Sequence, residues 1–273
     1  MKINSIGIIG YGVVGSAIDH YFSTNNIPVY IYDKFKSPWK KTFSNLLKTD
    51  LIFVSIPSNY DDDLQNFDLS NFYEILEILN NNNYNKAILF KSTLLPGTCK
   101  KFNIDYPKLN IIYNPEFLSE KTAVKDYANP KQIILGCTPF LNHKVRDSVG
   151  IFFNKIFFGV DIEIVSSTEA ECTKIFLNSF YSVKVQFFNE LYSLTDKIGV
   201  NYNSVIPLML GQGWIDPQHT RVPGPDGYYS YGGKCLPKDS CSLLALMKRY
   251  NTYHKILKST IEENKIIRPE NYI

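Results

Sequence analysis

The chain has 273 residues, of which 44% are hydrophobic and 20% charged, and its formal net charge is +3 at pH 7. This length allows two modest domains, and this composition is typical of a globular protein with a buried core. The small net charge and the lack of a dense lysine and arginine stripe argue against a nucleic-acid partner. No apolar run reaches the length of a membrane-spanning helix, so no membrane partner is expected.

The five cysteines of the chain are scattered and form no C-x-x-C pair: Cys99, Cys137, Cys172, Cys235 and Cys241. An odd number without paired spacing disfavours both a disulfide framework and a zinc site, and it favours a reducing compartment such as the cytoplasm. We expect no signal peptide, because Asp19 and His20 interrupt the first apolar stretch and no small-residue cleavage pattern follows.

The first expected element is an apolar strand at Ile6–Gly10 that runs directly into a glycine triplet. Gly10, Gly12 and Gly15 fit the G-x-G-x-x-G spacing, and residues 16–22 then have a composition that suits a helix. The first glycine allows the tight turn, the second lets a pyrophosphate approach the backbone, and the third allows close helix packing. Backbone N–H groups at the helix start bind phosphates. The residues expected to bind a dinucleotide here are Gly10, Tyr11, Gly12, Val13, Val14 and Gly15.

A second strand at Val29–Tyr32 ends at an acidic residue, Asp33. An acid at this place accepts hydrogen bonds from an adenosine ribose and repels a 2′-phosphate, so NAD is favoured over NADP. Lys34 and Lys36 follow the acid, and their positive charges could bind a 2′-phosphate, so NADP stays the alternative cofactor. A glycine-rich turn in an ordinary α/β domain is the structural alternative.

Further strands alternate with helical segments such as Asn71–Leu79, which is typical of β-α-β units and predicts a mainly parallel sheet. These strands are expected at Leu51–Ile56, Ala87–Lys91, Asn110–Tyr113 and Gln132–Leu135. Sheets of this kind bind ligands at the carboxyl ends of their strands. The strands are expected to end there in polar or turn residues, which include Ser55, Pro57, Ser92, Thr93 and Glu116. Of these, Ser55, Pro57, Ser92 and Thr93 are expected to contact the cofactor, together with Glu120.

A long helical pattern begins at about Ser166, and Thr168 with Glu171 fits a capping box. Glu171, Lys174, Asn178 and Asn189 share one side of this helix. On the pattern alone, a solvated polar face is the more common explanation of such a stripe. Gly199 is expected to end the helix, and a final helix is expected at 240–258.

The segment Gly232–Asp239 reads G-G-K-C-L-P-K-D and places one cysteine, Cys235, in a glycine turn. A nearby lysine and a helix N-terminus lower the pKa of a thiol and make it nucleophilic, and Pro237 suits the first turn of a helix. A tight turn with a structural cysteine is the alternative.

These motifs together resemble the UDP-glucose/GDP-mannose dehydrogenase family along nearly the whole chain. The resemblance rests on five ordered motifs: GYGVVG at 10–15, KSTLLPGT at 91–98, NPEFLSE at 114–120, E-x-x-K-x-x-x-N at 171–178 and GGKCLPKD at 232–239. It implies a Rossmann-type doubly wound, mainly parallel sheet over residues 1–165, followed by an all-helical central domain over 166–273. It also implies NAD as the cofactor.

The resemblance implies a four-electron oxidation in which the C6 alcohol of a nucleotide sugar becomes a carboxylate and two NAD are reduced. Cys235 would attack the intermediate aldehyde, and Lys174 with Asn178 would hold the developing oxyanion. Asp239, Glu116 and Thr93 would position or deprotonate the water that hydrolyses the thioester. The substrate contacts implied are Glu120, also near the nicotinamide, Arg221, which reaches the neighbouring subunit's substrate, Tyr231, Gly232 and Lys238. The long helix would pair two subunits into a homodimer.

The chain departs from the family where it ends, because family members continue into a third domain that contacts the nucleotide. We therefore expect weakened nucleotide contacts, a second chain that completes the substrate site, or a smaller substrate. Two further interpretations stay open at this point. One is a two-electron β-hydroxyacid-type dehydrogenase, which needs no cysteine, and the other is an NAD-binding protein with little turnover.

Overall fold

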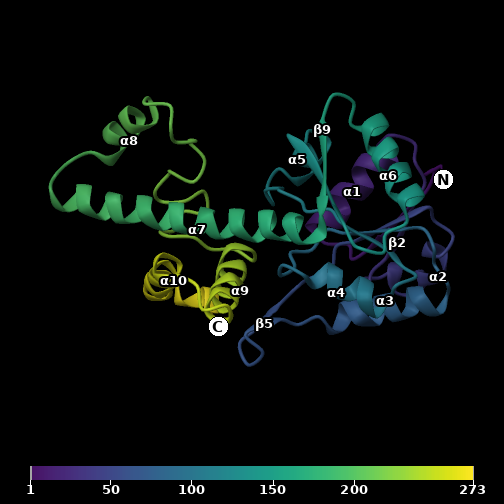
Figure 1. The fold of residues 1–273 in the computed structure, drawn as a ribbon. Coiled ribbons are helices and arrows are strands. Elements are labelled where there is room, and N and C mark those ends of the chain that lie inside the picture. Colours follow the sequence, from purple (N-terminus) through teal and green to yellow (C-terminus); the bar gives the residue numbers. More distant parts are fainter. Residues whose placement is uncertain (1, 273) are drawn as a thin grey trace. The chain divides into compact units, whose positions relative to one another are not determined.

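The computed structural model describes residues 2–272, which form two compact units (Figure 1). The sheet unit consists of residues 2–59 and 67–174, and the helical unit of residues 60–66 and 175–272. The short segment 60–66 therefore belongs to the helical unit although residues of the sheet unit flank it in the sequence. The domain limits expected from the sequence stay a prediction, because compactness does not show which segment folds on its own.

A seven-stranded sheet forms the centre of the sheet unit, in the order β2-β1-β3-β6-β7-β8-β9. Its strands are β1 (Ile6–Ile9), β2 (Val29–Tyr32), β3 (Leu51–Val54), β6 (Ala87–Phe90), β7 (Asn110–Tyr113), β8 (Gln132–Cys137) and β9 (Asp161–Ser166). Neighbouring strands pair in parallel, except that β7 and β8 are antiparallel. The strand order reverses at β1, which lies between β2 and β3. Ligands of open α/β sheets bind at the carboxyl ends of the strands beside such a point.

Helices cover both faces of this sheet (Figure 1). One face packs against α1 (Val13–Thr24), α5 (Ala123–Ala128) and α6 (His143–Ile156), and the other against α2 (Phe43–Leu46), α3 (Ser70–Asn81) and α4 (Thr98–Asp105). A short 3₁₀ helix, η1 (Trp39–Lys41), precedes α2. The predicted doubly wound, mainly parallel fold is confirmed.

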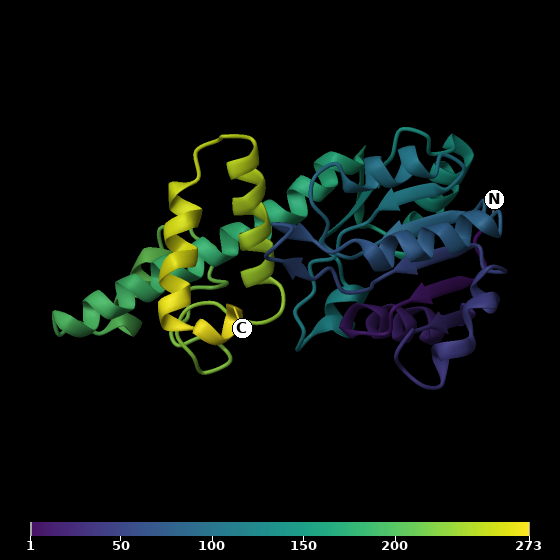
Figure 2. The ribbon, with the colours of Figure 1, turned by 90° about the horizontal axis from the view of Figure 1, so that it is seen from below.

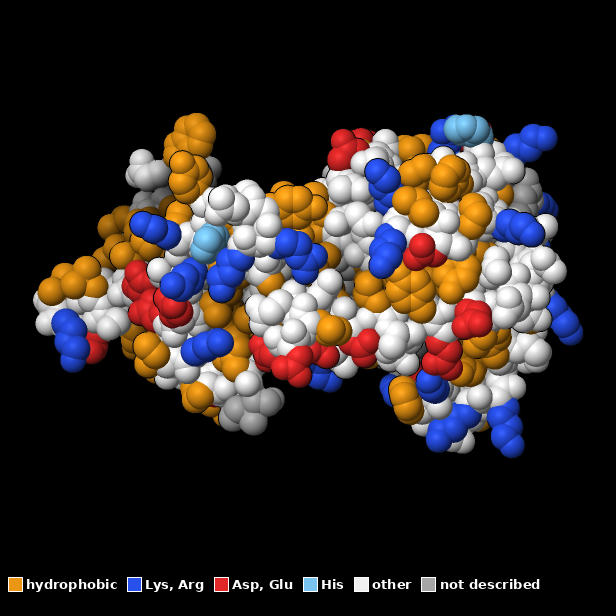
Figure 3. Space-filling view, turned by 60° about the horizontal axis from the view of Figure 1, so that its bottom comes forward, with side chains coloured by type: hydrophobic (Ala, Val, Ile, Leu, Met, Phe, Trp, Pro, Cys, Tyr) orange, Lys and Arg blue, Asp and Glu red, His pale blue; other side chains and the backbone are white. Residues whose placement is uncertain are grey.

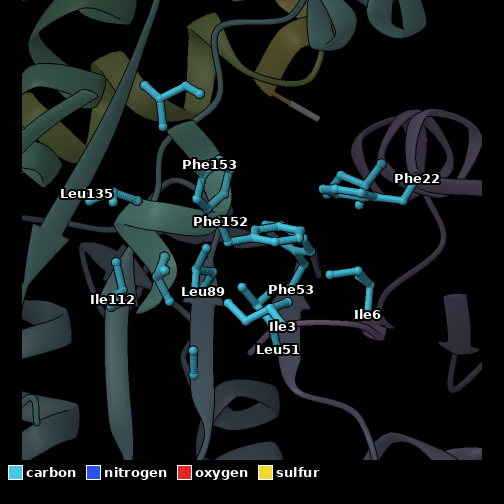
Figure 4. Close-up of a cluster of buried hydrophobic side chains, with 14 of the residues drawn as sticks. Ile3, Ile6, Phe22, Leu51, Phe53, Leu89, Ile112, Leu135, Phe152 and Phe153 are labelled. Atoms are coloured by element: carbon cyan, nitrogen blue, oxygen red, sulfur yellow. The ribbon is translucent and has the colours of Figure 1, made fainter. Parts of the chain in front are cut away.

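The two apolar layers follow from alternation along the strands, because successive side chains of a strand point to opposite faces. In β3, Phe53 packs in the layer of α1 and α6, whereas Val54 packs in the layer of α3 and α4. Figure 4 shows the first layer, where Phe22 of α1 and Phe152 of α6 gather with Phe53. Phe22 stacks on each of the two other rings, with 5.8 Å between centroids.

The strand predictions hold to within about two residues at their ends, but three strands have no counterpart in them. Strand β9 (Asp161–Ser166) lies at the edge of the sheet and is largely exposed, so its sequence carries no apolar run. The strands β4 (Tyr60–Asp61) and β5 (Asn66–Phe67) form a two-stranded sheet of two residues each, which is too short for a periodic pattern.

The helical unit contains most of α7 (Ser167–Lys197), followed by α8 (Tyr202–Leu210), α9 (Leu236–Arg249), α10 (Lys255–Ile267) and η2 (Pro269–Tyr272). A small core of Phe188, Tyr202, Ile206 and Val222 packs α7 against α8 and the loop that follows. The prediction of one final helix at 240–258 is wrong, since α9 and α10 are separate helices that lie side by side (Figure 2). Asn251 breaks the run with a φ of +52°, a conformation that asparagine adopts more readily than most residues.

The start of α7 differs from the predicted capping box. Ser166 and Glu169 form the box: the Glu169 carboxylate accepts hydrogen bonds from Ser166 N and Oγ, and Glu169 N donates to Ser166 Oγ. Glu171 instead accepts hydrogen bonds from the backbone N–H groups of Gly97 (2.6 Å) and Cys99 (2.7 Å) at the start of α4. Within the sheet unit, Glu171 therefore fastens α4 to the beginning of α7.

The polar stripe on α7 is buried rather than solvated, so the commoner explanation of that pattern is wrong. Glu171, Lys174, Asn178 and Asn189 are each less than a tenth exposed. Buried polar groups are costly unless they are hydrogen-bonded, so each of these side chains needs partners from elsewhere in the fold. The last turn ends as predicted at Gly199, which has a φ of +69°.

The surface carries mixed charges. On the face shown in Figure 3, lysine and arginine side chains are interspersed with acidic and apolar ones. Among residues 2–272, no helix is both long enough and apolar enough to cross a membrane.

Candidate active site

The glycine loop after β1 has the geometry of a phosphate-binding turn. Gly10 has a φ of +92°, and a Cβ atom on Gly15 would lie 2.1 Å from Gly10 O, so neither position tolerates a side chain. Gly12 is the N-cap of α1, has no side-chain cap, and has open space where a Cβ would stand. The N-terminus of α1 is therefore open to an anion, and its backbone N–H groups favour one.

Asp33 lies at the end of β2, beside this loop. Its carboxylate accepts hydrogen bonds from Tyr11 N (2.8 Å), Phe35 N (2.9 Å) and Lys36 N (3.0 Å). Partial burial opposes ionisation of Asp33, but these three donors and the Lys36 charge outweigh it and lower its pKa. The two lysines after the acid already have partners: Lys34 pairs with Glu74 (2.6 Å), and Lys36 donates to Tyr11 O (2.6 Å).

Hydroxyl side chains join the neighbouring strand ends. Ser55 Oγ, after β3, donates to Gly10 O (2.8 Å), and Ser92 Oγ, after β6, donates to Ile56 O (2.6 Å). Thr93, the next residue, is buried. The structure thus brings the predicted residues at the ends of β3 and β6 to the same edge of the sheet as the glycine loop, as the parallel topology requires.

A second cluster in the sheet unit joins Lys174 of α7 to the segment after β7. Its ammonium donates to Glu116 O and lies 3.3 Å from Glu116 Oε1 and 5.2 Å from the ring centroid of Phe117. The other carboxylate oxygen of Glu116 accepts a hydrogen bond from Leu118 N (2.7 Å). The predicted residues Lys174 and Glu116 are therefore direct neighbours. Glu120, on the following turn, is exposed.

Lys91 is a second basic group of this cluster and was not predicted to act. Burial lowers the pKa of Lys91 to about 7, and the nearby Lys174 charge adds to this effect while Glu116 opposes it. Its ammonium lies over the rings of Phe53 (5.7 Å) and Tyr127 (5.4 Å). The signal was present in the sequence, since Lys91 directly precedes Ser92 and Thr93 at a strand end.

The helical unit holds the cysteine. Cys235 is exposed, is not in a disulfide, and is the N-cap of α9, with Pro237 in the first turn. The predicted helix start is confirmed. The N-terminus of a helix stabilises a negative charge, which places this thiol where an anion is favoured.

Asp239, one turn into α9, is fully buried and joins two other predicted residues. Its Oδ2 accepts a hydrogen bond from Asn178 Nδ2 (2.6 Å), and its Oδ1 accepts one from Lys238 Nζ (2.5 Å). A buried carboxylate is tolerable when a cation and an amide satisfy its oxygens in this way. These bonds fix the position of the Asn178 amide relative to the start of α9.

The remaining predicted substrate-binding residues lie on the loop before α9. Tyr231 is buried, which raises its pKa, and its hydroxyl lies 3.4 Å from that of Tyr272. A Cβ on Gly232 would lie 2.4 Å from Arg268 Cζ. Arg221 is exposed. Sequence reasoning missed Arg268, because its only signal is a contact with a residue distant in the chain.

Two domain models of one family match this chain. The NAD binding domain of the UDP-glucose/GDP-mannose dehydrogenase family matches residues 35–148, and its central domain matches residues 168–266, which together make up more than half of the chain. The chain is also 29% identical over 266 residues to UDP-glucose 6-dehydrogenase of Campylobacter jejuni, and 31% identical over 255 residues to that of Rickettsia typhi. The chain belongs to the UDP-glucose/GDP-mannose dehydrogenase family.

These alignments cover 97% and 88% of this chain but only 63% and 54% of the two relatives. Among solved structures, a UDP-glucose dehydrogenase from Pyrobaculum islandicum has a TM-score of 0.79 at 18% identity, covering 97% of this chain and 68% of that one. A 3-hydroxyisobutyrate dehydrogenase from Mycobacterium tuberculosis has a TM-score of 0.72 at 11% identity, covering 99% and 95%. At these identities, the structures show the fold alone.

Family membership makes NAD the cofactor, and the residues of the sheet unit fit it. The open N-terminus of α1 at Gly12 suits the pyrophosphate, and the anionic Asp33 suits a ribose hydroxyl. Lys34 pairs with Glu74 at the surface, and Lys36 donates to Tyr11 O of the glycine loop. The residues that would hold NAD are therefore those of the glycine loop, Asp33 and the strand ends after β3 and β6.

Proposed function

We propose that this protein is an NAD-dependent nucleotide-sugar dehydrogenase of the UDP-glucose 6-dehydrogenase type, which oxidises the C6 alcohol of the sugar to a uronic acid. The observation that carries the proposal is the exposed Cys235 at the N-terminus of α9, in a chain whose other unit is an NAD-binding domain. A nucleophilic cysteine distinguishes a four-electron oxidation, which passes through a thioester, from a simple two-electron one.

The overall reaction consumes the alcohol, one water and two NAD, and it yields the carboxylate, two NADH and three protons. Bound NAD supplies the hydride acceptor in both oxidations. In the first, the alcohol loses a hydride and a proton and becomes an aldehyde. The Cys235 thiolate then adds to the aldehyde carbon through Sγ, and the resulting alkoxide takes up a proton to form a thiohemiacetal. Loss of a second hydride and a proton gives a thioester, and water cleaves its C–S bond and returns the thiolate.

The neighbouring residues have roles that follow from their chemistry. Lys174 is cationic and Asn178 keeps one amide N–H beyond the one donated to Asp239, so both suit a developing oxyanion. We assign the water of thioester hydrolysis to Asp239, Glu116 and Thr93. The direct contact between Lys174 Nζ and Glu116 Oε1, at 3.3 Å, supports this division, because it holds the ammonium for the oxyanion and the carboxylate for the water side by side.

We assign the sugar-nucleotide contacts to Glu120, Arg221, Tyr231, Gly232 and Lys238. Arg221 belongs to this set as a residue offered to the neighbouring subunit, so the proposal includes a homodimer. An exposed apolar stripe on α7 supports a second copy of the chain as its partner. The stripe consists of Phe176, Phe180, Phe187 and Leu194, each more than half exposed, at intervals of four and seven residues that keep them on one side of a helix. We place the protein in the cytoplasm, because Cys99, Cys137, Cys172, Cys235 and Cys241 all lack a disulfide.

The test is NADH formation by the purified chain with UDP-glucose, UDP-N-acetylglucosamine, UDP-galactose and GDP-mannose in turn. We expect two NADH per sugar with one of them. The variant Cys235→Ser should then form no uronic acid, while Cys172→Ser, a change at a partly buried cysteine on α7, should leave the rate unchanged.

Two outcomes would contradict the proposal. Full activity of Cys235→Ser with one NADH per substrate would favour a two-electron β-hydroxyacid-type dehydrogenase, a class that includes an enzyme whose fold this chain shares. Binding of NAD without turnover of any of the four sugars would favour a binding protein or a site completed by a second chain.

A further inference from the structure

Ser230, five residues before Cys235, is held in an unfavourable backbone conformation. Its φ is +59°, in the left-handed region that glycine and asparagine occupy most readily, and the residue is buried. Strain of about 1–3 kcal/mol at such a residue persists only where surrounding contacts over-determine it, and such residues cluster at functional sites. The contacts around Ser230 meet this description.

Three side chains from two helices hold Ser230. Its backbone N–H donates to Asn189 Oδ1 (2.8 Å), and its hydroxyl donates to Gln186 Oε1 (2.5 Å), both on α7. The same hydroxyl accepts a hydrogen bond from Asn264 Nδ2 of α10 (2.6 Å). Asn189, like Glu171, is a member of the buried α7 stripe that the proposed reaction does not use, and this contact explains its burial. Every polar atom of Ser230 except its carbonyl oxygen is thus bound to a side chain.

Asn264 extends the contact to the next residue of the loop. Its amide nitrogen also donates to Tyr231 O (2.8 Å), and its oxygen accepts hydrogen bonds from Asn271 Nδ2 (3.0 Å) and Tyr272 OH (2.8 Å). All four hydrogen-bonding positions of this amide are therefore used. Asn271 Nδ2 donates to Tyr231 O as well (2.9 Å). The backbone at Tyr231 is accordingly fixed by two amides from the end of the described chain.

Gly232 is held by packing. The guanidinium of Arg268 lies where a side chain of Gly232 would stand, and it is itself fixed by Asp226 (2.7 Å) and Glu270 (3.0 Å). The loop is therefore fastened at three consecutive residues, 230, 231 and 232. Between this fastened stretch and Cys235 lie only Gly233, with a φ of +80°, and Lys234. A change in the backbone conformation at Ser230 is therefore expected to displace the Cys235 thiol, because so few residues lie between them.

One atom in this network is unsatisfied. Gln186 Nε2 is buried and has no hydrogen-bond partner within residues 2–272. A buried unpaired donor costs about 1–3 kcal/mol. A network that served stability alone would contain neither a residue with a strained backbone nor a buried amide without a hydrogen-bond partner. Such departures are expected at functional sites.

We infer that Ser230, held by Gln186, Asn189 and Asn264, is a positioning residue that fixes Cys235 at the N-terminus of α9. The inference rests on the proposed role of Cys235 as a nucleophile. It adds α10 and the segment after it to the elements that determine the reactivity of the thiol, although none of their residues needs to touch the substrate.

The test measures alkylation of Cys235 by iodoacetamide in the full chain, without NAD or sugar, by mass spectrometry of the peptide that contains it. The variants are Ser230→Ala, which keeps the strain and loses the hydroxyl, Ser230→Gly, which loses both, and Asn264→Ala. The matched control is Thr260→Val, a buried change on α10 at a side chain bonded only within its helix, to Ile256 O (3.0 Å).

We expect alkylation at pH 7 to slow about three- to fivefold in the three variants, which is the size of the effect of a helix terminus on an anion. The pH midpoint of the rate should move upward in all three and stay unchanged in Thr260→Val. Ser230→Gly should have the higher Tm of the two serine variants, because it relieves the strain, so a folded variant is available even if Ser230→Ala is unstable.

Wild-type alkylation rates and midpoints in Ser230→Gly and Asn264→Ala would overturn the inference. Equal slowing in Thr260→Val would overturn it too, since the effect would then be general loosening of α10. Because the measurement needs no turnover, it is independent of the NADH assay. A chain without dehydrogenase activity would refute the proposed function and leave the alkylation comparison valid.

Discussion

Gly12 and Gly15 lie three residues apart in one motif, but the structure gives them different tasks. Gly15 is required for the fold, because a Cβ there would overlap Gly10 O, whereas a Cβ on Gly12 would enter open space. Gly12 also has an ordinary φ of −89°, so alanine fits the backbone. At the residue scale, Gly15 is thus needed for folding, whereas Gly12 is needed only for the approach of the dinucleotide.

We predict that Gly12→Ala keeps its Tm and binds NAD at least about tenfold more weakly, a loss of roughly 1.4 kcal/mol, because the methyl group occupies the approach of the pyrophosphate. Isothermal titration calorimetry with NAD measures this. Gly150→Ala on α6, whose Cβ also meets open space, should leave NAD affinity unchanged. Unaltered affinity in Gly12→Ala would show that the cofactor lies elsewhere.

Lys91 gives a prediction about pH. Its pKa is lowered to about 7 by burial, so the unfolded chain holds this proton up to higher pH than the folded chain does. The free energy of unfolding should therefore rise with pH from about 7 to about 10, by up to about 1.4 kcal/mol per pH unit. Lys91→Met should remove this rise, and Lys100→Met, an exposed change on α4, should keep it. Urea unfolding at pH 7, 8 and 9 compares the three proteins, and equal slopes for all would refute the assignment.

At the scale of elements, Glu171 joins α4 to α7 by accepting two hydrogen bonds. Both donors are neutral backbone N–H groups, and neither is a basic side chain. Burial raises its pKa to about 7, although the amides of Cys99 and Gly97 oppose this. A raised pKa of an acid gives stability that is complete below the unfolded value of about 4.5 and is lost as pH rises through about 7. The free energy of unfolding should accordingly fall toward alkaline pH on account of this carboxyl.

We predict that the free energy of unfolding falls by about 3 kcal/mol more in the wild-type protein than in Glu171→Gln between pH 4.5 and pH 8. The difference comes from the raised pKa of the Glu171 carboxyl. Urea midpoints at the two pH values measure the difference. Glu77→Gln, an exposed change on α3, should behave as wild type does. A parallel decline in Glu171→Gln would mean that other groups cause the pH dependence.

What the sequence predicts at this scale depends on the range of the signal. The glycine loop, six strands of the main sheet and the place of Pro237 in the first turn of a helix were predicted because each is encoded within about ten residues, as periodicity or as turn chemistry. The buried state of the α7 stripe was not predictable, because the partners of Glu171 lie at 97–99 and that of Asn178 lies at 239. The pattern of a solvated face and that of a buried polar face are identical until those partners are known.

At the scale of the whole molecule, the proposed homodimer depends on the exposed stripe of α7. Replacing Phe180 and Phe187 with aspartate places two charges in an interface that should exclude water, and an unpaired buried charge strongly opposes association. We predict a folded monomer in size-exclusion chromatography with light scattering, with a Tm lowered by the loss of the partner subunit. Ile151→Asp, at an exposed apolar residue of α6, is the control and should leave the dimer intact. A monomeric wild-type protein, or a dimer that survives both changes, would exclude this stripe as the interface.

The segment Tyr60–Asn66 has a consequence for how the protein is made. It belongs to the helical unit, and β4 contacts α9, which begins only at Leu236. On the ribosome, at roughly 5–20 residues per second, this segment emerges on the order of ten seconds or more before its partner helix does. The sheet strands that flank this segment are therefore able to pair before α9 exists. The contact between β4 and α9 forms only late in synthesis, after α9 has emerged.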